Sequence, residues 1–160
     1  MNKIFQKDKY MRSKFATKLI LMIVLAGLTS IANAQCKQFT KKYCLPGIEP
    51  FTYNGQLNSA VLNEGDAAEL LLTFYAGQSY RILVCNQETL GSLHFKLLDT
   101  ERNLIFDNKE FDYVQFWDFK ANSTQQLIVQ VVVPEKSKKN DMIQSGCVSI
   151  LVGFKDDSGN

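Results

Sequence analysis

From residue 51 onward, short runs of apolar residues alternate with polar turn signals. Within several runs apolar and polar side chains alternate one by one, which is the period of a β-strand with one buried face. Residues 93–97 and 147–154 show this alternation most clearly. The strongest apolar run is 127–133, and Pro134 should end it because proline offers no N–H to a sheet. Since no segment has a convincing helical period, we expect an all-β protein.

The spacing of these runs is typical of an antiparallel β-sandwich, and we expect a jelly-roll-like sandwich of about seven to nine strands. Asn54-Gly55 is a strong turn dipeptide, because both residues tolerate positive φ. The expected strands are 51–53, 69–75, 80–85, 93–97, 104–106, 113–120, 127–133 and 147–154.

Residues 1–34 are typical of a secretory signal peptide. A basic stretch precedes the apolar run Leu19–Leu28, and Ala32 and Ala34 stand at the small-residue positions before a cleavage site. The apolar run is about half the roughly 20 residues that a spanning helix needs. We therefore predict cleavage before Gln35 and one domain, a β-sandwich with a polar C-terminal tail, over residues 35–160. No other stretch is expected to span a membrane.

The charge distribution argues against a nucleic-acid partner. The whole chain has a formal net charge of +2, but residues 1–34 hold six of the 18 basic residues and one of the 16 acids. Residues 35–160 therefore carry 12 basic and 15 acidic side chains, a net charge of −3. A protein that replaces counterions on a nucleic acid needs the opposite balance.

All four cysteines, Cys36, Cys44, Cys85 and Cys147, follow the predicted cleavage site. An even number in an exported chain predicts two disulfides. Alternation along the strands places Cys85 on the same face as Arg81, and Cys147 on the same face as Ser149, in both cases away from the main apolar face. The two cysteines could meet if their strands are neighbours, which would leave Cys36 and Cys44 to bond to each other. We therefore predict the pairs Cys36–Cys44 and Cys85–Cys147. With no C-x2-C spacing, we expect these cysteines to bind no metal.

The sequence predicts no catalytic residue and no cofactor. His94, the only histidine, alternates with apolar neighbours and is expected to face solvent. No second base or G-x-S-x-G motif accompanies it. Six acids between residues 99 and 118 leave two alternatives open, a small carboxylate-based hydrolase and a calcium-dependent adhesion module. Neither has a diagnostic spacing.

Aromatic residues between 111 and 117 are the candidates for an interaction site. Exposed aromatic side chains can stack on sugars or anchor a protein partner. We name Tyr113 and Trp117 as candidate interaction residues, although a sandwich also buries aromatics in its core. The partner would be an envelope protein or a glycan.

The stretch from about residue 51 to 154 resembles the pre-peptidase C-terminal type of β-sandwich. The matching features are residues 76–82 (AGQSYRI), strand 93–98 with Asp99 at its end, the Trp117-Asp-Phe119 motif and the final strand 148–154. The signal ending Ala34-Gln35 is also similar to those of small exported Bacteroidetes proteins. The resemblance implies an accessory or binding module and supplies no site residue.

Together these features predict an exported, non-enzymatic binding or structural module, periplasmic or extracellular, that contacts protein or glycan. Edge strands of an open sandwich can pair with another chain, so a homodimer is a further expectation.

Overall fold

The computed structural model describes residues 31–135 and 143–156. The chain divides into two compact units, Met1–Ala34 and Gln35–Asn160. Most of the predicted signal peptide lies outside the described residues, as do residues 136–142 and the end of the predicted C-terminal tail. Cleavage before Gln35 stays a prediction. In the described part, no helix has the length and apolar character needed to cross a membrane.

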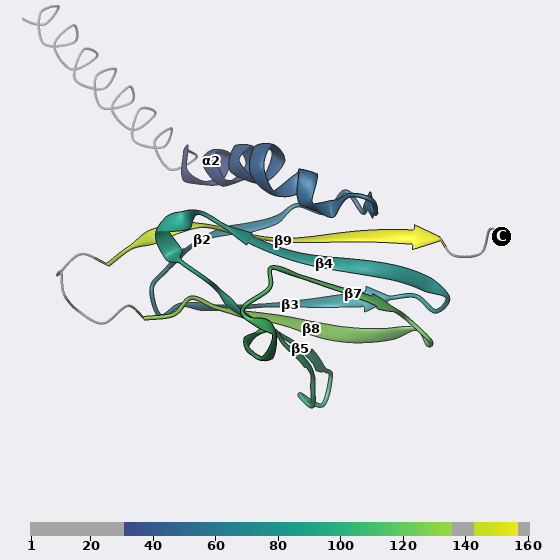
Figure 1. Ribbon diagram of the computed structural model, residues 1–160. Helices are drawn as coiled ribbons and strands as arrows, with labels where there is room; N and C mark the ends of the chain where they lie inside the picture. Colours follow the sequence, from purple (N-terminus) through teal and green to yellow (C-terminus); the bar gives the residue numbers. More distant parts are fainter. Residues whose placement is uncertain (1–30, 136–142, 157–160) are drawn as a thin grey trace, which may run out of the picture. The chain divides into compact units, whose positions relative to one another are not determined.

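The second unit is an antiparallel β-sandwich of two sheets (Figure 1). Sheet A has the order β7-β4-β9, and β1 and β2 both pair with the far side of β9. Sheet B has the order β3-β8-β5-β6. The strands are β1 (Thr52–Tyr53), β2 (Asn58–Asn63), β3 (Ala67–Phe74), β4 (Gln78–Asn86), β5 (His94–Asp99), β6 (Leu104–Asp107), β7 (Phe116–Lys120), β8 (Gln125–Val132) and β9 (Ser145–Asp156).

The order of β2 to β9 is that of a jelly roll. Consecutive strands lie in opposite sheets except for the β5–β6 hairpin, so that β2-β9-β4-β7 forms one sheet and β3-β8-β5-β6 the other. The predicted fold class is therefore confirmed. Two strands differ from the prediction. β2 was missed because its small and polar residues do not alternate, and β7 begins at Phe116 rather than Tyr113.

The core between the sheets is built from the predicted alternating faces. Val84 and Ile82 of β4 are buried, and so are the inward residues of β8 and β9, such as Val129 and Val148. Trp117 and Phe119 of β7 also pack against this core. These faces are confirmed because alternation depends only on the local pleat of the strand.

Contrary to the sequence prediction, the segment before β1 is helical. It contains α2 (Ile31–Phe39), a π-helical turn η2 (Thr40–Cys44) and a 3-10 turn η3 (Leu45–Ile48). Its buried residues are Cys36, Thr40, Cys44 and Ile48, spaced four apart along one helical face. Only one of these four is a large aliphatic residue, so the segment has no strong helical hydrophobic pattern.

This segment, from Cys36 onward, covers the outer face of sheet A. Ile48 and Cys44 form a second core with Leu83 of β4 and Leu151 of β9. Gly153 of β9 makes the close approach feasible, because an added Cβ would lie 2.7 Å from Phe51 Cβ and 2.8 Å from Ile48 Cγ2. The sheet is therefore covered on both faces.

The predicted disulfide pairing is wrong, although all four cysteines are bonded. The bonds join Cys36 to Cys147 and Cys44 to Cys85. Cys85 lies opposite Ser149 in the β4–β9 register, so Cys147 is displaced two residues along β9. Such diagonal neighbours are about 7–8 Å apart, which exceeds the usual Cα separation in a disulfide. Each strand cysteine instead bonds to the helical segment above it, with Cα separations of 5.3 and 5.7 Å.

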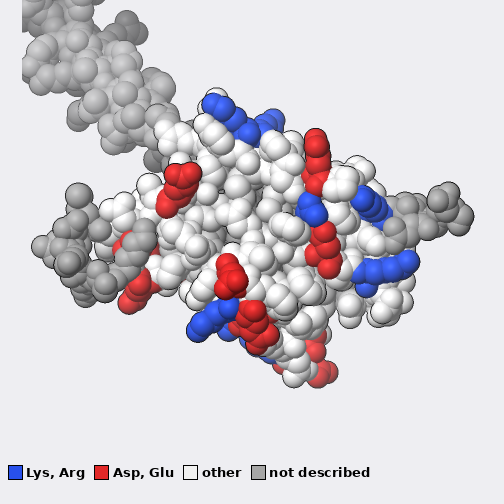
Figure 2. Space-filling view, in the orientation of Figure 1, with Lys and Arg blue, Asp and Glu red and all other residues white. Residues whose placement is uncertain are grey.

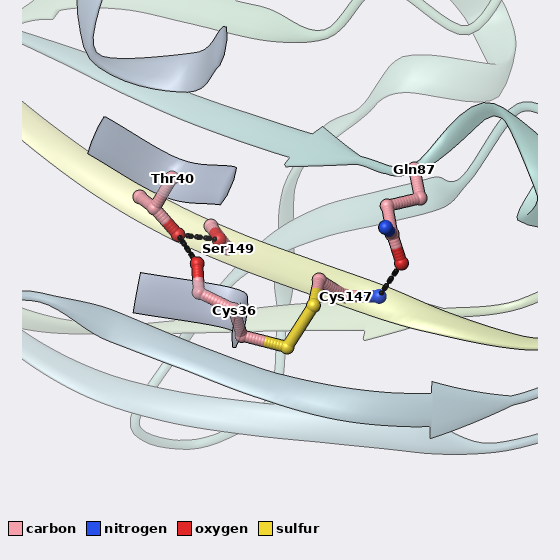
Figure 3. The surroundings of a disulfide bond; sticks show 5 residues. All are labelled: Cys36, Thr40, Gln87, Cys147 and Ser149. Carbon is pink, nitrogen blue, oxygen red and sulfur yellow. Dashed lines mark hydrogen bonds between the residues drawn. A yellow bond between two sulfur atoms is a disulfide. The ribbon is translucent and has the colours of Figure 1, made fainter. Parts of the chain in front are cut away.

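Buried polar contacts surround the first disulfide (Figure 3). Thr40 Oγ1 donates to the Cys36 carbonyl at 2.7 Å and lies 2.6 Å from Ser149 Oγ. The backbone N–H of Cys147 donates to Gln87 Oε1 at 2.8 Å. The hydroxyls of Thr40 and Ser149 and the Cys147 N–H are thus hydrogen-bonded, as burial requires. The Tyr53 hydroxyl, which packs against the same second core, is buried without a hydrogen-bond partner in the described part of the chain.

Arg81 of β4 also attaches this segment to sheet A. Its guanidinium donates to both carboxylate oxygens of Asp118 at 2.8 and 2.7 Å, and to the Glu49 carbonyl at 2.6 Å. It lies over the ring of Phe116, 4.3 Å from the ring centroid. The hydrogen bonds to Asp118 raise the pKa of Arg81, so its guanidinium stays charged.

Candidate protein-binding surface

Residues 104–116 carry a large share of the exposed apolar side chains. Of the eleven large apolar residues that are exposed in the described part of the chain, six belong to this stretch. We call these residues the β6–β7 edge, because they belong to the edge strands β6 and β7 and the segment that joins them. Its members are Leu104, Ile105, Phe111, Tyr113, Val114 and Phe116.

Charged residues do not dominate the face drawn in Figure 2. Basic and acidic side chains stand there in several small groups, some with both signs side by side, and uncharged surface lies between the groups. Concentrated exposed apolar surface is unusual for a protein that works alone, and it often marks a binding site.

An aromatic stack joins the β6–β7 edge to the core. Phe106 is buried and stacks on Trp117, with ring centroids 4.1 Å apart. Phe111 stacks on the same Phe106 ring at 5.4 Å. Trp117 is therefore partly buried at the base of this surface, while Phe111 is 47% exposed above it.

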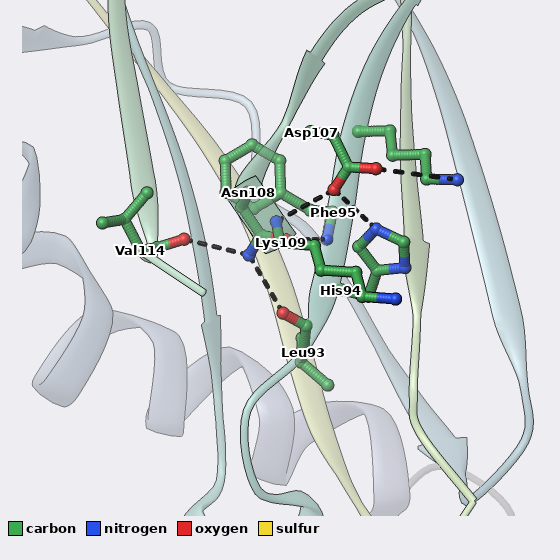
Figure 4. Close-up of polar contacts among 8 residues, drawn as sticks. Leu93, His94, Phe95, Asp107, Asn108, Lys109 and Val114 are labelled. Atoms are coloured by element: carbon green, nitrogen blue, oxygen red, sulfur yellow. Dashed lines mark hydrogen bonds and ion pairs between the residues drawn. The ribbon is translucent and has the colours of Figure 1, made fainter. Parts of the chain in front are cut away.

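Asn108 holds the loop beneath this surface (Figure 4). It begins the 3-10 turn η5 (Asn108–Phe111) and is only 1% exposed. Its Oδ1 accepts from the Phe95 N–H at 2.9 Å, and its Nδ2 donates to the Leu93 and Val114 carbonyls at 3.0 Å each. One side chain thus uses both of its polar ends to fix the loop against β5.

The loop after η5 has an uncommon backbone conformation. Asp112 and Tyr113 have φ of 52° and 57°, in the left-handed region that ordinary residues seldom occupy. Hydrogen bonds from Tyr113 N–H to the Asn108 carbonyl and from Val114 N–H to the Phe111 carbonyl close the turn. The turn leaves Tyr113 40% exposed, with its ring edge toward His94 at a centroid distance of 6.3 Å.

His94 is partly buried and hydrogen-bonded to Asp107 rather than lying free at the surface. Its Nε2 is 2.7 Å from Asp107 Oδ1, and the same oxygen accepts the Lys109 N–H at 2.9 Å. Burial opposes ionisation of Asp107, but the Lys109 N–H, His94 and Lys96 outweigh it and lower the pKa of Asp107. Asp107 therefore joins η5 to β5 as a charged group.

The carboxylates between residues 99 and 118 do not share a partner. Asp99 closes its own turn by accepting from the side chain and backbone of Asn103, which lower its pKa. Asp107 bonds to His94, and Asp118 to Arg81. Within residues 31–135 and 143–156, no cluster of three or more His, Cys, Asp or Glu could hold a metal ion.

A groove of about 540 Å³ opens at the opposite side of the sandwich. Its apolar lining comes from both sheets, including Phe74 of β3 and Phe154 of β9, and its polar residues include Asn54 and Gln56. Tyr80 contributes a hydroxyl that accepts the Tyr75 N–H and donates to Gln78. Among the described residues, the only titrating groups that line this groove are the tyrosines Tyr75 and Tyr80, so this lining suits binding rather than acid–base chemistry.

Sequence reasoning located part of the candidate site. Tyr113 lies on the exposed surface and Trp117 at its base, whereas Asn108 was missed. Asp107 before η5 is a signal that could have found the loop, because aspartate is a preferred N-cap residue and here accepts the Lys109 N–H. The left-handed turn at Asp112 and Tyr113 has no comparable signal, since neither residue is glycine.

Comparisons with known proteins leave the family open. No family model matches the chain, and none of the curated proteins matches it. Among solved structures, a match is the PliG protein of Aeromonas hydrophila, described as a periplasmic lysozyme inhibitor of g-type lysozyme. The two are 12% identical with a TM-score of 0.46, over 67% of this chain and 90% of that one. A similarity of this size establishes neither a common fold nor a common function.

Proposed function

We propose that the protein is an exported, non-enzymatic module that binds another protein through the β6–β7 edge. The carrying observation is the concentration of six exposed large apolar side chains within residues 104–116. Aromatic side chains that pack on buried residues commonly contribute most of the binding energy of a protein interface.

The construction of this surface supports binding without large rearrangement. Phe111 rests on the buried ring of Phe106, and Asn108 fixes the loop that carries Tyr113. Because these contacts already order the loop in the free protein, a partner need not supply that ordering on binding. A preformed apolar surface is therefore available to a protein partner.

Export is part of the same proposal. Two disulfides bond all four cysteines, and such bonds persist in oxidising compartments such as the periplasm or the extracellular space. The predicted signal peptide over residues 1–34 would deliver the chain there. A sandwich cross-linked by two disulfides and carrying exposed apolar residues at one edge fits a protein that binds its partner outside the cytoplasm.

The test is affinity capture from an envelope extract with three immobilised forms of the protein: wild type, Phe111→Ser with Tyr113→Ser, and Tyr43→Ser. Tyr43 is 62% exposed in η2 and serves as the matched aromatic control. We expect one protein to be retained by wild type and by the Tyr43 variant. The double variant should retain it at least about tenfold less, as for loss of about two interface anchors.

Equal retention by all three forms would refute the assignment of the β6–β7 edge. Retention that survives protease treatment of the extract but is lost after glycosidase treatment would show a glycan partner and refute the protein-binding proposal. Circular dichroism of each form before immobilisation verifies that the substitutions leave the fold unchanged.

A further inference from the structure

Strand β3 forms an unusually open edge of sheet B. It pairs with β8 along its whole length, Ala67–Phe74, and in the described part of the chain no strand pairs with its other side (Figure 1). Natural edge strands are commonly short, bulged, or marked by lysine or proline. β6 has four residues and a register shift opposite β5, and β7 carries Asp118 and Lys120. β3 has eight residues, no register shift opposite β8, and neither lysine nor proline. Its one charged residue, Glu69, is paired with Arg102.

The backbone groups that face outward from β3 follow from its register with β8. Val133 N–H donates to the Asp66 carbonyl at 2.9 Å, immediately before the register pair Ala67–Val132. Hydrogen-bonded pairs alternate along an antiparallel ladder, so Leu70 and Leu72 bond to β8. The intervening residues Glu69, Leu71 and Thr73 therefore direct their N–H and C=O groups to the open edge.

Apolar side chains near this edge are incompletely covered. Leu70 and Leu72 point toward the core but are only partly buried, and Leu71 on the outer face is 54% exposed. The groove of about 540 Å³ is lined in part by Leu71, Leu72, Thr73 and Phe74 of the same strand. A further strand beside β3 would thus gain backbone hydrogen bonds and also cover apolar surface on both faces.

The sequence of β3 is self-complementary. In an antiparallel pair centred on Leu71, this residue lies opposite Leu71 of a second copy, and Glu69 lies opposite Thr73 of that copy. On the inner face Leu70 meets Leu72. No like charges face one another, whereas centring the pair on Glu69 would oppose two carboxylates and weaken the pairing.

We propose that two copies of the protein dimerise through β3, paired antiparallel about a two-fold axis at Leu71. The three outward residues of each strand then exchange about six backbone hydrogen bonds, and the two four-stranded sheets become one continuous sheet. The dimer leaves the β6–β7 edge free, because β6 lies at the other end of sheet B. Its test is therefore independent of the proposed function.

Sedimentation velocity of the oxidised protein tests the proposal, and we expect a concentration-dependent dimer with a dissociation constant in the micromolar range. Leu71→Lys should weaken the dimer at least about tenfold, since two ammonium groups meet at the axis. Ile105→Lys, at a residue 51% exposed on β6, is the matched control and should dimerise as wild type does.

Thr73→Lys tests the register, because it would place an ammonium group opposite Glu69 at two equivalent positions. We expect the dimer to become severalfold tighter. Leu71→Cys should give a disulfide-linked dimer on a non-reducing gel, since residues facing each other in a hydrogen-bonded pair have Cα atoms about 5.5 Å apart. Ile105→Cys should not.

A wild-type protein that stays monomeric up to about 1 mM would overturn the dimer, because even a weak specific interface is populated at that concentration. Equal weakening by Leu71→Lys and Ile105→Lys would overturn the assignment of β3. Weaker dimerisation of Thr73→Lys would overturn the Leu71-centred register.

Discussion

Individual polar side chains decide the shape of the candidate binding surface. Asn108 satisfies one backbone donor of β5 and two backbone acceptors while almost completely buried. Aspartate would keep the acceptor but lose both donors, and alanine would lose all three contacts. Neither aspartate nor alanine could therefore make all three hydrogen bonds that asparagine makes at this position.

Asn108→Ala should destabilise the protein by about 3 kcal/mol, because it leaves buried backbone groups of Phe95, Leu93 and Val114 without their side-chain partner. Urea unfolding measures the change. Asn103→Ala is the control, since Asn103 is exposed and bonds to an exposed carboxylate. A loss for Asn108→Ala no larger than for Asn103→Ala would contradict the role assigned to Asn108.

The free energy of unfolding should depend on pH in the acidic range because of Asp107. Its pKa is lowered in the folded protein from the ordinary value of 3.8, so the unfolded chain binds the proton more readily. The stabilising contribution is fully present above that ordinary value and is lost as pH falls through the lower folded-state pKa. We expect the stability difference between wild type and Asp107→Asn to shrink over this acidic range.

Unfolding free energies of both proteins between about pH 2 and 6 provide the measurement. A difference that stays constant across this range would show that the Asp107 carboxylate contributes nothing to the pH dependence. The groups facing Asp107 are His94 and Lys96 of β5 and the Lys109 N–H of η5.

At the scale of elements, the helical segment before β1 is held to sheet A by long-range covalent bonds. The disulfides close loops with sequence separations of 111 and 41 residues. Chain-entropy estimates for loops of this length are about 5 and about 4 kcal/mol. Since a domain has a net stability of about 5–15 kcal/mol, both bonds matter for folding.

Free-thiol counts in paired variants distinguish the observed connectivity from the one predicted from the sequence. Replacing Cys36 and Cys147 with serine should leave no free thiol, because Cys44–Cys85 remains intact. Replacing Cys85 and Cys147 should leave two free thiols and a larger loss of thermal stability. The reverse thiol counts would contradict the observed pairing and support Cys36–Cys44 with Cys85–Cys147.

At the scale of the whole molecule, the two open sides of the sandwich differ in chemistry. The β6–β7 edge presents aromatic and aliphatic side chains on a loop, whereas β3 presents unpaired backbone groups beside a groove. Side-chain surfaces suit a partner of different shape, and strand edges suit another strand. If both proposals hold, a dimer formed through β3 therefore leaves the β6–β7 edge free for another protein.

The sequence determined the features that depend on local geometry. Alternation in the β4, β8 and β9 segments identified the buried faces, because neighbouring side chains of a strand point to opposite sides whatever the strand packs against. The same parity placed Cys85 and Cys147 off the core, and the export context of four cysteines predicted that all would be bonded. The sandwich class followed from the spacing of these strands.

Only the tertiary structure decided which of these parts meet. The two-residue offset of Cys147 from Cys85 depends on the β4–β9 register. The helical segment to which both cysteines bond takes its position by packing on sheet A. Likewise, exposure of Tyr113 and burial of Asn108 depend on where a loop crosses β5. These are contacts between residues distant in sequence, and no local pattern of hydrophobicity encodes which surfaces come together.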